Sequence, residues 1–194
     1  LIEWAHICSG RVARLADEVT DVEHKKNLIR LSKALLNVPE NKPSGFYEAV
    51  LSVYICFSAD PDSLGTLDRY LTPFYTEDIK NGIIVREDAK EYLQELFLMI
   101  QATVSPKDYR FTRGAESHFC IGGYLPDGSD GFNEVSHLIV ESLMELPIYI
   151  PQITLRWTEK TPHDVLRFMM DAERKDINKR IAFTNDEKRI KCYT

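Results

Sequence analysis

The sequence lacks the features that mark membrane and nucleic-acid-binding proteins. No apolar run approaches the roughly 20 residues that cross a bilayer, and no basic segment precedes an apolar one at its start. The chain is slightly acidic, with 24 basic and 30 acidic side chains and a formal net charge of -6. We therefore expect a cytoplasmic protein that binds neither membranes nor nucleic acid.

Common metal and nucleotide motifs are also missing. The five histidines form no His-Glu-x-x-His motif, and the four cysteines form no Cys-x-x-Cys pair. Gly122 and Gly123 do not belong to a Gly-x-Gly-x-x-Gly sequence, and no Walker-type lysine is found. We expect no metal site, no nucleotide site and no disulfide framework.

The composition instead predicts a folded core. Of the 194 residues, 44% are hydrophobic and 10% are aromatic, without a low-complexity segment. The sequence begins at Leu1 in what reads as a helix already under way and stops at Thr194 after a charged segment. We expect a chain that is incomplete at both ends.

The first half of the sequence predicts helices. Apolar residues at helical spacing indicate a surface helix over residues 17–36, and the almost uniformly apolar residues 46–59 indicate a buried helix. Residues 67–80 precede another amphipathic helix over residues 86–103. We assign residues 1–105 to a mainly helical part.

The second half, residues 106–194, alternates strand-like and helix-like patterns. The predicted strands are residues 119–121, 153–157 and 181–183, and the helices between them are residues 132–146 and 161–174. This order is typical of parallel strands joined by right-handed crossovers. The fold class is therefore predicted to be α/β, with a helical N-terminal half followed by strand-helix-strand units.

Several polar side chains lie next to the predicted strands. Ser117 and His118 precede the first strand, where they either contact a ligand or form a solvated strand end. Arg156 on the second strand suits either a carboxylate ligand or a structural ion pair. Asn185 and Asp186 follow the third strand and suit either ligand contacts or a helix cap.

Cys120 raises a similar pair of alternatives. It lies two residues from His118, so both side chains share one face of a strand. The pair could form an activated thiolate, but a small buried thiol in an apolar strand is the more common case.

Two blocks of sequence carry a family resemblance. In the first block, the matching positions are Gly122, Gly123, Asp127, Gly128, Asp130, Asn133 and Glu134. The second block covers residues 64–75 and includes Asp68 and Arg69. Residues 153–157 and 183–186 follow in the expected order. Together these segments resemble the glycyl radical enzymes of the pyruvate formate-lyase superfamily, which commonly have Gly-Gly followed by Asp-Gly-x-Asp-Ala-x-Asn-Glu-Leu.

The resemblance implies a fold and a chemistry. The fold would be part of a ten-stranded α/β barrel made from two half-barrels. An activating enzyme with an iron-sulfur cluster and S-adenosylmethionine would install a glycyl radical, and a cysteine inside the barrel would pass it to a small-molecule substrate. The intact protein would bind no cofactor directly. It would be an anaerobic cytoplasmic lyase, dehydratase or formate C-acetyltransferase-type transferase, often a homodimer.

The sequence departs from the family pattern at the radical residues. None of the four cysteines has Glu two residues later, and no Arg-Val-x-Gly-Tyr motif is present. We therefore expect both radical residues outside residues 1–194, no catalytic residue within them, and an inactive chain when it is alone. The resemblance places Ser117, His118 and Phe119 near the substrate. A naturally short accessory or structural subunit is the alternative function.

Overall fold

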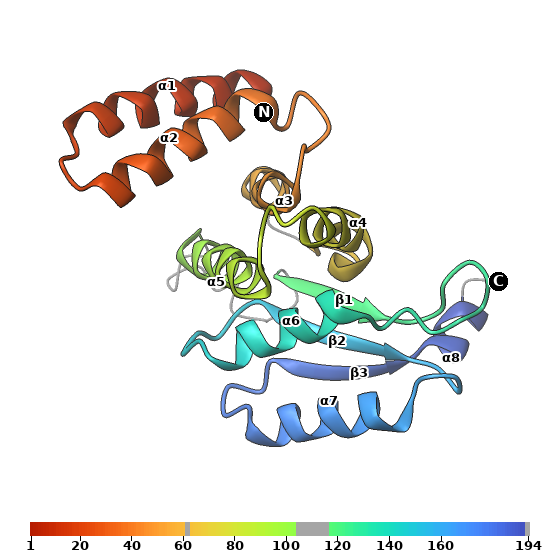
Figure 1. Cartoon of the computed structure of the whole chain (residues 1–194). Coiled ribbons are helices and arrows are strands. Elements are labelled where there is room, and N and C mark those ends of the chain that lie inside the picture. Colours follow the sequence, from red (N-terminus) through yellow and green to blue (C-terminus); the bar gives the residue numbers. More distant parts are fainter. Residues whose placement is uncertain (61–62, 104–116, 193–194) are drawn as a thin grey trace.

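The computed structural model describes residues 1–60, 63–103 and 117–192. Five helices are followed by three strands that alternate with three further helices (Figure 1). The helices are α1 (Ile2–Glu18), α2 (Val22–Asn37), α3 (Phe46–Ala59), α4 (Leu67–Lys80), α5 (Arg86–Thr103), α6 (Glu134–Met144), α7 (His163–Lys175) and α8 (Asp186–Lys191). The strands are β1 (His118–Gly122), β2 (Gln152–Trp157) and β3 (Ile181–Asn185).

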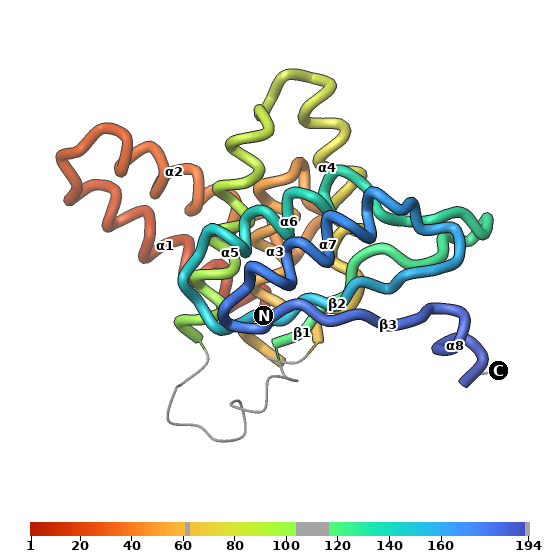
Figure 2. The backbone as a smooth tube through the Cα atoms, turned by 90° about the horizontal axis from the view of Figure 1, so that it is seen from below, coloured from red at the N-terminus to blue at the C-terminus, as the bar shows by residue number. Residues whose placement is uncertain are grey.

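Helices α1 and α2 form a pair that projects from the rest of the molecule (Figures 1 and 2). The predicted helix over residues 17–36 is wrong at its start, because the chain is extended at Val19 and α2 begins at Val22. The Asp21 carboxylate accepts a hydrogen bond from the His24 backbone N–H at 2.7 Å. This cap satisfies a donor in the first turn of α2 and sets the break between the two helices.

The other helices of the first half follow the sequence pattern. The structure confirms the predicted helices over residues 46–59 and 86–103. Residues 67–80 also form a helix. The predicted boundary between residues 105 and 106 lies outside the described residues, because residues 104–116 are not described.

The three strands form one parallel sheet in the order β1-β2-β3. This confirms the predicted parallel pairing, with strands one or two residues longer than predicted. The edge of β1 that faces away from β2 pairs with the segment before α4, since the Cys120 N–H donates to the Gly65 carbonyl at 2.7 Å. Strand β3 ends the sheet on the other side.

One hydrophobic core joins the helices to the sheet. Phe97 of α5, Leu138 of α6 and Met169 of α7 are buried in one cluster with Phe119 and Leu155 of the sheet. Figure 2 shows α6 and α7 on the same side of the strands. The opposite side of the sheet, which we call the polar face, carries His118, Cys120, Gln152, Thr154, Arg156, Ala182 and Thr184. Among the described residues, no helix is long and apolar enough to span a membrane.

Candidate functional site

The polar face brings His118 and Thr154 together. Parallel pairing sets Cys120 opposite Thr154, so His118 lies one step away on the same side of the sheet. His118 Nε2 lies 2.6 Å from Thr154 Oγ1. Partial burial and the positive charge of Arg189 both lower the pKa of His118. The imidazole is therefore neutral near pH 7 and offers a hydrogen-bonding group without charge.

Cys120 is a buried thiol on this face rather than a partner of the imidazole. Its side chain is 5% exposed. Its Sγ accepts from Nη1 of Arg189 at 3.7 Å, whereas the imidazole of His118 bonds to Thr154. The buried-thiol alternative therefore describes the observed geometry.

Arg156 and Asp186 form the ion pair that the sequence left as one alternative. Nε and Nη2 of Arg156 both lie 2.7 Å from Oδ1 of Asp186, which is fully buried. Oδ2 of Asp186 accepts from the Tyr124 backbone N–H at 2.9 Å. Asn185 caps α8, since its Oδ1 accepts from the Lys188 N–H at 2.9 Å. These contacts attach α8 to β2 and to the chain after β1.

Ser117 and Phe119 lie on either side of His118 but have different surroundings. Ser117 is buried, and its carbonyl accepts from the Gln152 N–H at 2.8 Å. Phe119 faces the helices instead of the polar face, and its ring stacks on Phe97 with centroids 5.8 Å apart. Phe119 is therefore part of the core.

The motif positions Asp68 and Arg69 meet Gly122 in space. Oδ2 of Asp68 accepts from the Gly122 N–H at 2.8 Å and from the Ser136 hydroxyl at 2.6 Å. Arg69 Nη2 donates to the carbonyls of Gly122, at 3.0 Å, and Tyr124. Asp68 is completely buried, and this burial raises its pKa despite the two hydrogen bonds. We call these residues, with Asp130 and Asn133, the motif cluster.

Asp130 and Asn133 hold the loop that leads from β1 into α6. Asp130 accepts from the Thr161 hydroxyl and, at 3.0 Å, from the Phe132 N–H. Asn133 caps α6 through the Val135 and Ser136 N–H groups, at 2.9 and 3.3 Å. Together with Gly122 and Gly123, these residues shape the loop by hydrogen bonds within the protein.

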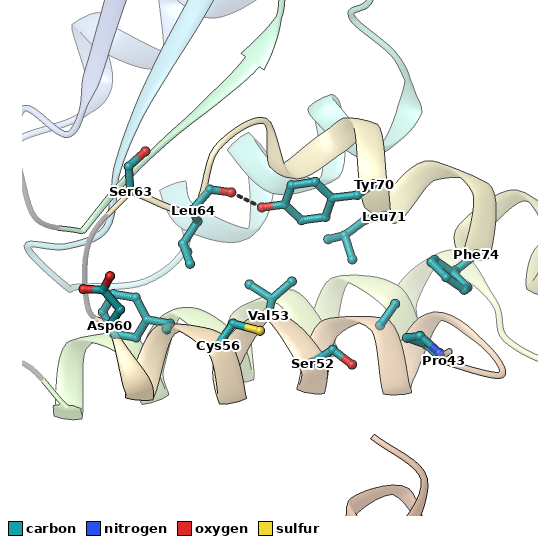
Figure 3. Close-up of a pocket in the computed structure, with 12 residues that line it drawn as sticks. Pro43, Ser52, Val53, Cys56, Asp60, Ser63, Leu64, Tyr70, Leu71 and Phe74 are labelled. Atoms are coloured by element: carbon teal, nitrogen blue, oxygen red, sulfur yellow. Dashed lines mark hydrogen bonds between the residues drawn. The ribbon is translucent and has the colours of Figure 1, made fainter. Parts of the chain in front are cut away.

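A separate groove of about 560 Å³ lies between α3 and α4 (Figure 3). Its walls are mostly apolar, with Val53, Phe57 and Leu71 among the lining residues. The Tyr70 hydroxyl bonds to the Leu64 carbonyl within it. The groove is not part of the polar face, and its described lining residues also include the polar side chains of Ser52, Asp60, Ser63 and Tyr70.

Two contributors to the polar face are not predicted by the sequence pattern. They are Thr154 on β2 and Arg189 on α8. The register of two adjacent parallel strands could have paired Thr154 with the His118 side of β1, but Arg189 reaches the face only through the placement of α8. Within the described residues, no group of three His, Cys, Asp or Glu side chains could hold a metal ion.

Comparison with known proteins identifies the family. A family model described as pyruvate formate lyase-like matches residues 1–193. The chain belongs to this pyruvate formate lyase-like family. The resemblance predicted from the motif positions is therefore confirmed.

The family relatives include glycyl radical enzymes. The chain is 29% identical over 191 residues to trans-4-hydroxy-L-proline dehydratase of Clostridioides difficile, covering 91% of this chain and 24% of that protein. It is 31% identical over 181 residues to isethionate sulfite-lyase of Bilophila wadsworthia, covering 86% and 22%. A solved glycyl radical enzyme from Archaeoglobus fulgidus superposes with a TM-score of 0.86 at 27% identity, over 99% of this chain and 26% of that one. The chain thus spans about a quarter of the length of these pyruvate formate lyase-like relatives.

Proposed function

We propose that these 194 residues are one section of a glycyl radical enzyme that acts on a small organic substrate under anaerobic conditions. The observation that carries this proposal is a sheet with one helix-covered face and one polar face, in a chain matched by the family model over residues 1–193. In the proposed protein the three parallel strands belong to an α/β barrel whose remaining strands come from sequence outside residues 1–194.

The polar face is the proposed substrate-facing surface. Parallel sheets are usually covered on both faces. In this structure helices cover one face, and on the polar face Ala182 of β3 is exposed. His118 and Thr154 then lie inside the closed barrel, where the neutral imidazole can donate or accept a hydrogen bond. Exclusion of water from such an interior protects a radical intermediate and strengthens each polar contact.

The remaining site candidates are proposed to support the pocket rather than bind the substrate. Arg156 donates to the Asp186 carboxylate, which also accepts from the Tyr124 N–H. Asn185 accepts from the Lys188 N–H at the start of α8. Ser117 supports β2 through its carbonyl. These positions fix the strands and the loop that carry the polar face.

The radical chemistry is proposed to come from the rest of the polypeptide. The named relatives are a dehydratase and a sulfite-lyase, so the reaction class is a radical dehydration or lyase reaction. The glycine radical and the cysteine that contacts substrate lie outside these residues, and an activating enzyme installs the radical. The intact enzyme is proposed to be a cytoplasmic homodimer.

The first test is to sequence the coding region on both sides of this segment and to activate the full-length product. The product is mixed anaerobically with a radical-activating enzyme, S-adenosylmethionine and a reductant, and followed by electron paramagnetic resonance. We expect an organic radical whose hyperfine splitting changes when the protein is grown with deuterated glycine. A stop codon directly after Thr194, or a full-length product that never carries a glycine radical, would favour the accessory subunit instead.

A further inference from the structure

Arg189 extends a positive charge onto the polar face. It projects from α8, which lies beyond the carboxyl end of β3 (Figure 1). Its Nη1 lies 3.7 Å from the Sγ of Cys120, next to the position of Thr154 on β2. The side chain therefore spans from the last helix to the first strand across the polar face.

This charge is not neutralised within the described part of the chain. No described carboxylate lies within 4.0 Å of Arg189, whereas the other arginine on the face, Arg156, contacts Asp186 at 2.7 Å. The positive charge of Arg189 also contributes to the lowered pKa of His118, so the two groups share one electrostatic environment. Within residues 1–60, 63–103 and 117–192, the polar face thus combines an imidazole, a hydroxyl and a cation that has no carboxylate partner there.

The geometry leaves most of the guanidinium donors available. An arginine has five N–H donors arranged in a planar fork, and the hydrogen bond that Arg189 makes to a described residue is to a thiol, which is a weak acceptor. Such a fork suits the paired oxygen atoms of a carboxylate or of another oxyanion. Arg189 is exposed in this structure and would be enclosed in the proposed barrel, where a neutral polyol would leave its charge without a partner, which is costly.

We infer that Arg189 binds an oxyanion group of the substrate and selects small carboxylates or sulfonates over neutral polyols. This inference rests on the proposed function, because it takes the polar face as the substrate-facing surface. His118 and Thr154 then face the uncharged, hydroxyl-bearing end of the same molecule. The position of Arg189 makes it a specificity-determining residue rather than a catalytic one.

The test compares matched anionic and neutral probes on the full-length protein before radical activation. Lactate is compared with 1,2-propanediol, and 2-hydroxyethanesulfonate with ethylene glycol, by isothermal titration calorimetry. We expect the better anion of the two to bind at least about tenfold more tightly than its neutral counterpart, and the Arg189→Gln variant to lose about 10- to 100-fold in affinity for it. The stronger of the two anions identifies carboxylate or sulfonate as the preferred group.

Two variants control for charge and fold. Lys191→Gln removes the same charge from another exposed position on the same helix and should leave anion affinity within about twofold. Arg189→Lys keeps the charge without the planar fork and should give an intermediate affinity. Circular dichroism checks that each variant is folded.

The inference and the proposed function fail in different ways. Equal anion affinity in Arg189→Gln and wild type, no binding of either anion, or tighter binding of the neutral probes would overturn the role of Arg189, even if the glycine radical forms. Anion binding that depends on Arg189 in a protein that never forms the radical would support the anion site and contradict the radical enzyme.

Discussion

At the scale of single residues, Asp68 shows how a motif position can serve the fold. Its carboxylate is fully buried and accepts the Gly122 N–H and the Ser136 hydroxyl, whereas its Oδ1 has no hydrogen-bond partner among the described residues. Removing this acceptor leaves two donors without partners in the interior. The residue connects α4, β1 and α6 at a single point.

The Asp68→Ala variant should lower the free energy of unfolding by about 2–4 kcal/mol, because each buried unsatisfied donor costs about 1–3 kcal/mol. Asp17→Ala, at an exposed position in α1, should change it by less than about 0.5 kcal/mol. Urea unfolding at micromolar chain concentration, followed by circular dichroism, measures both. Equal effects in the two variants would mean that the hydrogen bonds of Asp68 do not stabilise the fold.

The same residue predicts a pH dependence. Burial raises the folded-state pKa of Asp68 above its ordinary value of 3.8, so the folded state holds the proton to higher pH than the unfolded state does. The stability that Asp68 contributes is therefore fully present below pH 3.8 and decreases as the pH rises through the raised pKa. Asp68→Asn cannot titrate, so its stability relative to wild type should improve from about pH 4 to about pH 7. A constant difference over that range would contradict the raised pKa.

At the scale of elements, the turn after β1 depends on backbone that only glycine adopts readily. Gly123 has φ +81, and a Cβ there would lie 2.9 Å from Oδ2 of Asp186 and 3.0 Å from Nε of Arg156. The ion pair that attaches α8 to β2 therefore packs directly against this glycine. The backbone of the loop after β1 therefore lies in close contact with side chains of β2 and α8, and only glycine leaves room for that contact.

Three glycine-to-alanine substitutions separate backbone strain from close packing. Gly128 has φ +77 but only Lys160 Nζ at 3.6 Å, so Gly128→Ala should cost about 1–2 kcal/mol. Gly123→Ala adds a clash and should cost about 2–5 kcal/mol. Gly10 lies within α1 with no atom within 4 Å of a Cβ, so Gly10→Ala should stabilise by about 0.5–1 kcal/mol. Melting temperatures in any other order would contradict this account.

At the scale of the whole molecule, the sheet ends at an uncovered strand. Strand β3 has one neighbour in the described part of the chain, and its Ala182 and Phe183 are exposed. An unpaired parallel edge with exposed apolar residues promotes pairing with another chain. On the polar face, Ala182 of β3 is exposed, whereas Cys120 and Thr154 of the other two strands are buried.

We therefore predict that the 194-residue chain, expressed alone, associates as its concentration rises. Ala182→Lys places a charge on the β3 edge strand and should reduce this association, as measured by sedimentation velocity. Met170→Lys makes a comparable change on α7, where Met170 is 62% exposed, and should leave association unchanged. A monomer at every concentration that melts cooperatively would count against an uncovered edge.

The sequence alone was sufficient for most of the secondary structure and for the family. Helical periodicity located α3 and α5, alternating and apolar segments located the strands, and contiguous motif residues identified the relatives. These signals are local, since each depends on residues within one element or one loop. The sequence prediction failed where a cap interrupts the periodicity, because α1 ends at Glu18 and Asp21 caps the start of α2.

Only the tertiary structure decided how these elements combine into a site. The Asp68–Gly122 contact spans 54 residues, the Arg156–Asp186 pair 30, and the Arg189–Cys120 contact 69. Apolar burial packs the helices on one side of the sheet, and side-chain alternation then gathers His118, Thr154 and Arg156 on the other. Local spacing determines which face a residue occupies within its own element, but which distant residue it meets depends on how the elements pack.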